Sequence, residues 1–156
     1  MGAGKTTVGR LLAEQMGFQF IDADDRIELR EAKTIPEIFK DLGESAYRDM
    51  ETEFLKSMLR SGIVKLVMAT GGGMIEREVN HPLLRKLGTV VYLEADFATV
   101  MQRVPHDPHR PLLNNPGVVT ERFNRRQPQY KKLAQITVST AGKTPEAISE
   151  AVMGQL

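Results

Sequence analysis

The feature that most constrains the fold is the segment GAGKTT at residues 2–7, which reads as the second half of a phosphate-binding loop. The full motif is G-x-x-x-x-G-K-[ST], with a strand before it and a helix after it. Its small residues let backbone N–H groups approach an anion closely, and the helix presents its positive end there. An amphipathic helical pattern does follow, so we prefer this interpretation to a chance match in a chain terminus.

Helical and strand patterns alternate along the rest of the chain. Gly17, Gly43 and Gly62 are natural helix stops, and Pro128 is expected to break a helix. Strands separated by helices, with apolar strand interiors, favour a parallel α/β sheet sandwiched by helices. We expect strands at residues 18–21, 63–70, 89–93 and 135–140, and helices at residues 5–16, 24–31, 34–42, 45–60, 82–86, 97–104, 118–126 and from residue 144.

Composition limits the class of protein. A chain of 156 residues with 41% apolar and 26% charged residues is typical of one globular domain, which we place at residues 1–156. No apolar run reaches the roughly 18 residues of a membrane span. There are no cysteines, which excludes disulfides and thiolate catalysis. The net charge is +1 and the basic residues are scattered, so we expect no nucleic-acid partner. We expect a cytoplasmic monomer.

The phosphate loop assigns roles to its own residues. Lys5 would reach the β- and γ-phosphates of a bound nucleotide, and the Thr6 hydroxyl would ligate Mg²⁺. The remaining loop residues would bind phosphate through the backbone; these are Gly2, Ala3, Gly4 and Thr7.

Two acidic residues follow the first expected strand. Asp22 and Asp24 lie two positions apart, so their side chains project from one side if the chain stays extended. In parallel sheets, ligands bind at the carboxyl ends of the strands. These carboxylates are therefore candidates for a site, although a solvated acidic turn that includes Asp25 fits the same residues.

Several further motifs occur in a consistent order and spacing: FIDADDRIE, IPEIFKDLGESAYRDMETE, ATGGG, RPLL and RRQPQY. Together with GAGKTTVGRLLA, they make the chain resemble the shikimate kinase family over essentially its whole length. The resemblance implies a P-loop kinase fold of the nucleoside monophosphate kinase type, with a five-stranded parallel sheet. It also implies transfer of the γ-phosphoryl group of ATP, with Mg²⁺, to the 3-hydroxyl of shikimate.

The resemblance assigns the acceptor site to residues within and after the helices at about 24–61. Asp22 would hold Mg²⁺ through water, and Asp24 would orient the accepting hydroxyls and act as base. Buried or bidentate arginines suit the carboxylate of a small ring acid. The remaining acceptor residues implied by the family motifs are Arg48, Arg126, Gly72, Phe39 and Tyr47.

Two residues depart from the family pattern. Tyr47 stands where most members have phenylalanine, so its hydroxyl needs a partner, and Gln129 stands where leucine is usual. We expect little effect from Gln129. We interpret Arg122 and Arg125, near the family's substrate arginine Arg126, as solvated surface residues.

The nucleotide side of the site involves a Pro-rich loop. The resemblance makes residues 105–117 a lid in which Arg110 contacts the transferring phosphate, so that Lys5, Asp24 and Arg110 are the catalytic residues. Arg103 would stack on adenine, and the loop that contains Lys143 would flank it. His106 and His109 could be interpreted as a metal pair, but two loop histidines provide too few ligands.

The family's phosphate loop often carries an internal methionine where this chain has Met1. We therefore expect that the family's first, central strand is missing from the chain as given, together with the loop's first glycine, a difference of about ten residues. Without that strand, the chain as given would be less stable and poorly active.

Two other functions fit part of the pattern. A related small-molecule kinase acting on gluconate or a nucleotide would share the phosphate loop, and gluconate is also a polyol carboxylate. A nucleotide-binding module without catalysis would fit the incomplete loop. The combination of Asp24, Arg48, Gly72 and Arg126 favours shikimate as the acceptor.

Overall fold

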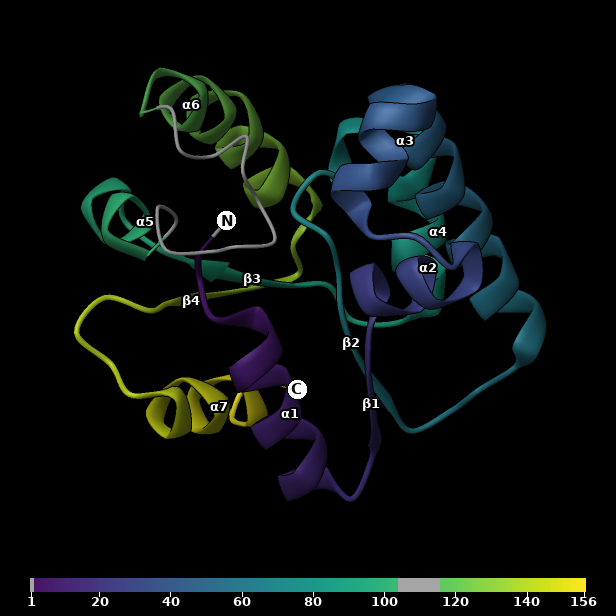
Figure 1. Cartoon of the computed structure of the whole chain (residues 1–156). Coiled ribbons are helices and arrows are strands. Elements are labelled where there is room, and N and C mark those ends of the chain that lie inside the picture. Colours follow the sequence, from purple (N-terminus) through teal and green to yellow (C-terminus); the bar gives the residue numbers. More distant parts are fainter. Residues whose placement is uncertain (1, 104–115) are drawn as a thin grey trace.

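The computed structural model describes residues 2–103 and 116–156 (Figure 1). Helices and strands alternate along the chain, as the sequence predicts. The helices are α1 (Lys5–Met16), α2 (Ala23–Glu31), α3 (Ile35–Ser61), α4 (Asn80–Leu87), α5 (Phe97–Arg103), α6 (Pro116–Leu133) and α7 (Pro145–Met153), with a short 3₁₀ turn η1 (Met74–Glu76). The strands are β1 (Gln19–Asp22), β2 (Leu66–Ala69), β3 (Val91–Glu94) and β4 (Ile136–Ser139).

The strands form two parallel pairs. In the first pair Asp22 of β1 lies opposite Ala69 of β2, and in the second Glu94 of β3 lies opposite Ser139 of β4. Helices flank both pairs: α1 and α7 lie together on one side of β3 and β4, and α5 and α6 lie on the other (Figure 1). This arrangement confirms the expected parallel α/β architecture.

The apolar core consists of two clusters. One includes Val8 and Leu12 of α1, Leu93 of β3 and Val138 of β4. The other joins β1 to the helices α2, α3 and α4, which gather beside β1 and β2 in Figure 1. Because α1 also contacts β1 and β2, it ties the two strand pairs together.

Helix α1 begins in a way that suits an anion. Gly4, at its N-cap, has a left-handed backbone (φ 78°), and no side chain caps the helix or places an acidic group in its first turn. The first N–H groups of an α-helix have no partner within the helix. The loop therefore directs backbone donors and the positive helix end toward the same place.

Helix α3 contains the break expected at Gly43. That glycine has a non-helical backbone (φ 85°, ψ 163°), so two helical pieces meet there at a kink. The first piece begins with a capping box, in which Thr34 and Glu37 each bond to the backbone of the other.

Helix α6 corrects one expectation. It continues through Pro128 to Leu133 instead of ending there, although an interior proline costs about 3 kcal/mol or more. Packing on both sides explains the continuity, because Arg126 is 3% and Leu133 2% exposed. The side-chain amide of Gln129 donates to the carbonyl oxygen of Arg125 at 3.2 Å, one turn earlier.

Strand β2 is shorter and less buried than expected. Lys65 has φ 56°, which ends the extended backbone on its N-terminal side, and Val64 is 77% exposed. Within β2 only Ala69 is fully buried. Among the described strands β2 pairs with β1 alone, so its other edge lacks the cover that a doubly flanked strand would have. None of the described helices is long and apolar enough to cross a membrane.

Candidate active site

The start of α1 and the carboxyl end of β1 meet at a bonded pair of side chains. The Thr6 hydroxyl donates to Oδ2 of Asp22 at 2.8 Å. The other carboxylate oxygen, Oδ1, accepts the backbone N–H of Asp24 at 3.0 Å, so Asp22 also caps α2. The structure therefore brings together the two residues that the sequence assigns to Mg²⁺.

This pair fits a magnesium ion that is shared with a nucleotide. Mg²⁺ usually keeps several waters and binds through one or two carboxylates plus phosphate oxygens, so a complete protein cage is not needed. The described residues contain no cluster of three acidic or histidine side chains that could hold a metal alone. The Thr6 hydroxyl and the Asp22 carboxylate would be the protein's contribution.

Asp24 and Tyr47 form the next part of the site. The Tyr47 hydroxyl donates to Oδ1 of Asp24 at 2.9 Å, and its ring packs edge-on against Phe39, with 5.2 Å between centroids. Tyr47 is only 3% exposed. Burial, and then the negative charges of Asp24 and Glu51, raise the pKa of Tyr47. The hydroxyl therefore stays protonated and acts as a donor to Asp24.

Arg48 is buried in α3 among acidic side chains. Its Nη1 donates to Glu51 at 2.7 Å, its Nη2 donates to Glu44 at 2.8 Å, and its Nε lies 3.5 Å from Glu76. Burial acts to lower the pKa of the Arg48 guanidinium. The attraction and hydrogen bond of Glu51, followed by the contributions of Glu44 and Glu76, outweigh burial and raise this pKa. Glu51 itself is fully buried, and burial raises the pKa of its carboxyl to about 7 despite the arginine.

The glycine turn after β2 lies against these groups. A Cβ atom at Gly71 would overlap the Asp24 carboxylate and crowd Glu51. A Cβ at Gly73 would overlap the guanidinium of Arg48. The backbone approaches both charged groups so closely that a side chain at either position would force one of them to shift. Between them, the carbonyl of Gly72 accepts the Tyr130 hydroxyl at 2.5 Å.

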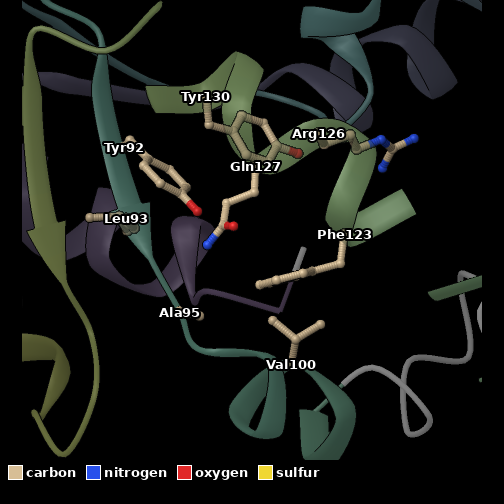
Figure 2. A pocket seen from close by; sticks show the side chains of 8 residues that line it. All are labelled: Tyr92, Leu93, Ala95, Val100, Phe123, Arg126, Gln127 and Tyr130. Atoms are coloured by element: carbon tan, nitrogen blue, oxygen red, sulfur yellow. The ribbon is translucent and has the colours of Figure 1, made fainter. Parts of the chain in front are cut away.

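Helix α6 supplies the second buried arginine. Arg126 donates through Nε to Oε1 of Glu76 at 3.0 Å, and the same oxygen lies 2.6 Å from Arg125. Figure 2 shows the guanidinium of Arg126 pointing away from Tyr92 and Gln127. Arg48 and Arg126 thus meet at one carboxylate, that of Glu76.

The interpretation as a solvated residue was wrong for Arg122, whereas Arg125 is at the surface, with 48% of its side chain exposed, and forms ion pairs there. The Arg122 side chain is 17% exposed and lies 3.6 Å from Glu44, while Arg125 pairs with Glu76 and Glu121. The cause is the direction of α6, which places one face against η1. Neither Glu76 nor Glu44 was singled out from the sequence. Glu76 lies just beyond the ATGGG segment, and Glu44 lies within the segment at residues 35–53 but was assigned no role there.

Two hollows lie near Arg126. The larger is an open cleft of about 440 Å³, in the range of small-molecule sites. Its walls are Glu44, Ser45, Arg48, Glu76, Arg77, Arg125 and Gln129. The smaller, drawn in Figure 2, holds about 20 Å³ between β3 and α6, enough for about one water molecule.

The nucleotide-side residues are placed only in part. Lys5 opens α1, and Lys143 is exposed just after β4. Arg103 ends α5, but its side chain is not described. Arg110 and the lid residues 105–115 lie outside the described residues, as do His106 and His109.

The start of α1 and the bonded Thr6–Asp22 pair are the nucleotide side of a P-loop kinase. The two buried arginines that share Glu76 suit a small anionic acceptor. Comparison with known proteins then identifies the family. The family model for shikimate kinase matches residues 1–156, so the chain belongs to the shikimate kinase family.

Individual relatives agree over the whole chain. A shikimate kinase of Persephonella marina is 41% identical, covering 100% of this chain and 94% of that protein. One of Marinomonas sp. is 39% identical, covering 98% and 86%. Among solved structures, shikimate kinase from Acinetobacter baumannii in complex with shikimate matches with a TM-score of 0.92 and 38% identity, covering 99% and 87%. The enzyme from Aquifex aeolicus matches at 0.85 and 33%, covering 98% and 89%.

Proposed function

We propose that the chain transfers the γ-phosphoryl group of ATP to the 3-hydroxyl of shikimate, with the roles assigned below. The observation that carries this proposal is the convergence of Arg48 and Arg126 on the carboxylate of Glu76, just after a glycine turn that packs against both Asp24 and Arg48. Shikimate is a carboxylate on a polyhydroxylated ring, so it needs cationic donors at one end and hydroxyl acceptors at the other. The neighbour from Acinetobacter baumannii was solved with shikimate bound, which supports the same acceptor here.

On the nucleotide side, the loop at residues 2–7 holds the phosphates through its backbone N–H groups. Lys5 neutralises the β- and γ-phosphates. Thr6 and Asp22 hold Mg²⁺, which supplies further neutralisation of the phosphate charge when it is bound. The short distance between the Thr6 hydroxyl and the Asp22 carboxylate supports this shared role.

On the acceptor side, Arg48 and Arg126 bind the carboxylate of shikimate. Asp24 accepts hydrogen bonds from the ring hydroxyls and takes the proton of the attacking one. The N–H of Gly72 donates to the ring, since the glycine turn lies against Asp24 and Arg48. Phe39 and Tyr47 form the apolar wall, and their edge-on contact supports this.

Phosphoryl transfer depends on positioning and charge neutralisation more than on covalent help from the protein. The proposed catalytic set is Lys5, Asp24 and Arg110, with Arg110 contacting the transferring phosphate from the lid. Arg103 and Lys143 would bind the adenine end of ATP. We further propose a single catalytic domain that works as a cytoplasmic monomer.

A coupled assay of ADP release tests the acceptor. We expect turnover with shikimate and at most trace turnover with gluconate or a nucleoside monophosphate at the same concentrations. Gluconate is the sharpest competitor, because it offers a carboxylate and hydroxyls without the ring. Equal or greater turnover with gluconate would refute the assignment, and ADP release that needs no acceptor would indicate a simple ATPase.

A further inference from the structure

The carboxylate of Glu76 lies between the two arginines assigned to the acceptor. Its Oε1 accepts from Nε of Arg126 at 3.0 Å and from Arg125 at 2.6 Å, and its Oε2 lies 3.5 Å from Nε of Arg48. The side chain is 16% exposed and lines the open cleft. An internal carboxylate therefore touches both groups that would recognise an external one.

The backbone fixes Glu76 in this place. It ends the turn η1, where its N–H donates to the carbonyl of Gly73 at 2.9 Å. The glycine turn is itself packed against Asp24 and Arg48, and η1 contacts α6. Glu76 is thus held directly after the glycine turn that we place beside the acceptor ring.

The two arginines depend on Glu76 to different degrees. Arg48 has close partners of its own in Glu44 and Glu51. For Arg126, Glu76 supplies the one ion pair found within the described part of the chain. Burial opposes the charge on Glu76, but Arg126, Arg125 and Arg48 outweigh it and hold the pKa of this carboxyl below its usual value. Glu76 is therefore ionised at neutral pH.

We propose that Glu76 is an internal competitor of the acceptor's carboxylate, which occupies Arg126 in the free enzyme and weakens the binding of a negatively charged acceptor. This inference rests on the proposed role of Arg48 and Arg126. The carboxylate of shikimate can bind the whole guanidinium of Arg126 only if Glu76 breaks its hydrogen bond to Nε. Two carboxylates beside the same arginines also repel each other. Glu76 sets the affinity for the acceptor and takes no part in the transfer step.

The test uses Glu76→Gln, which keeps the shape of the side chain and removes its charge. We expect the KM for shikimate to fall by about three- to tenfold, with kcat and the KM for ATP within about twofold of the wild type. Calorimetric titration with shikimate should show the same gain in affinity. Glu121→Gln is the matched control, because Glu121 pairs with Arg125 at the exposed end of the cluster and should leave the KM unchanged.

Other outcomes separate the possible failures. An unchanged or higher KM for shikimate in a cooperatively folded Glu76→Gln variant would overturn this inference, and Glu76→Leu should repeat the direction of the effect. Arg126→Ala tests the proposed carboxylate site itself. If Arg126→Ala raises the KM while Glu76→Gln does nothing, only the competitor role fails; if Arg126→Ala also does nothing, the acceptor site is wrong.

Discussion

The Tyr47 hydroxyl donates a hydrogen bond to Oδ1 of Asp24 across 2.9 Å, joining α3 to the start of α2 beside the glycine turn. Asp24 is the residue to which we assign the accepting hydroxyls of the substrate. One oxygen of that carboxylate therefore already has a buried donor, and this donor helps to fix its orientation. Phenylalanine at this position could not make the bond.

Tyr47→Phe should separate stability from catalysis. Removing a buried hydrogen bond to a charged group should lower the free energy of unfolding by about 1–2 kcal/mol. The ring still fills its place beside Phe39, so we expect kcat with shikimate to stay within about threefold of the wild type. Urea denaturation and the ADP-release assay measure the two effects.

Tyr92→Phe is the control, since Tyr92 lies on β3 beside the small cavity of Figure 2 and stacks on Tyr130. Its effect on stability should be smaller. A Tyr47→Phe variant as stable as the wild type would show that this hydrogen bond contributes nothing to the fold.

Glu51 should give the protein a pH-dependent loss of stability. Burial is the main cause that raises the pKa of its carboxyl from 4.5 to about 7, Asp24 adds to it, and Arg48 opposes it. The unfolded chain releases this proton at lower pH than the folded chain does. The contribution of Glu51 is therefore fully present below pH 4.5 and is lost as the pH rises to about 7, by about 3 kcal/mol.

The comparison of wild type with Glu51→Gln isolates this effect from the other carboxylates. The difference in unfolding free energy, wild type minus variant, should fall as the pH rises from about 4.5 to 7 and stay level above that. Chemical denaturation at closely spaced pH values measures it. A difference that is constant across this window would show that Glu51 keeps an ordinary pKa in the folded protein.

Gly71→Ala should damage the site through contact alone. The added Cβ would overlap the Asp24 carboxylate and crowd Glu51, so one of these groups must shift. We expect a loss of about 1–3 kcal/mol in stability and at least about a tenfold fall in kcat/KM for shikimate. Gly88→Ala is the matched control, because a Cβ there meets nothing within 4 Å. Wild-type activity in Gly71→Ala would mean that the turn is looser than the structure shows.

Thr6→Ala should weaken the binding of Mg²⁺ in the active site. It removes the hydroxyl that bonds to Asp22 and that we assign to the metal. The Mg²⁺ concentration for half-maximal activity should rise by about tenfold, and Thr6→Ser should restore most of the loss. An unchanged Mg²⁺ requirement in Thr6→Ala would remove this hydroxyl from the metal site.

Local patterns predicted much of the fold because they depend on nearest neighbours. The capping box at Thr34, the αL stops at Gly17 and Gly62 and the break at Gly43 all form as expected. The continuation of α6 through Pro128 could not be predicted, because it depends on packing from distant elements. Strand β2 was predicted at residues 63–70 but spans only Leu66–Ala69, for the same reason. An apolar run does not reveal which strand edges pair with another strand.

The candidate site was predictable where a motif names the residue. Thr6 meets Asp22, and Arg48 and Arg126 meet at the carboxylate of Glu76, so residues that the motifs name lie together. The acidic residues around the arginines were missed, since Glu44, Glu51 and Glu76 look like ordinary surface positions in the sequence. Only the three-dimensional arrangement shows that they neutralise buried cations.

We propose that Arg48 and Arg126 hold the carboxylate of shikimate while Asp24 holds its hydroxyls, next to the phosphates on the loop at residues 2–7. A crystal structure of the chain with shikimate, ADP and Mg²⁺ is the decisive experiment for this arrangement. We expect the carboxylate within hydrogen-bond distance of both guanidinium groups, the ring beside Gly72, and the 3-hydroxyl between Asp24 and the nucleotide. Shikimate bound elsewhere, or turned so that its carboxylate faces away from both arginines, would contradict it.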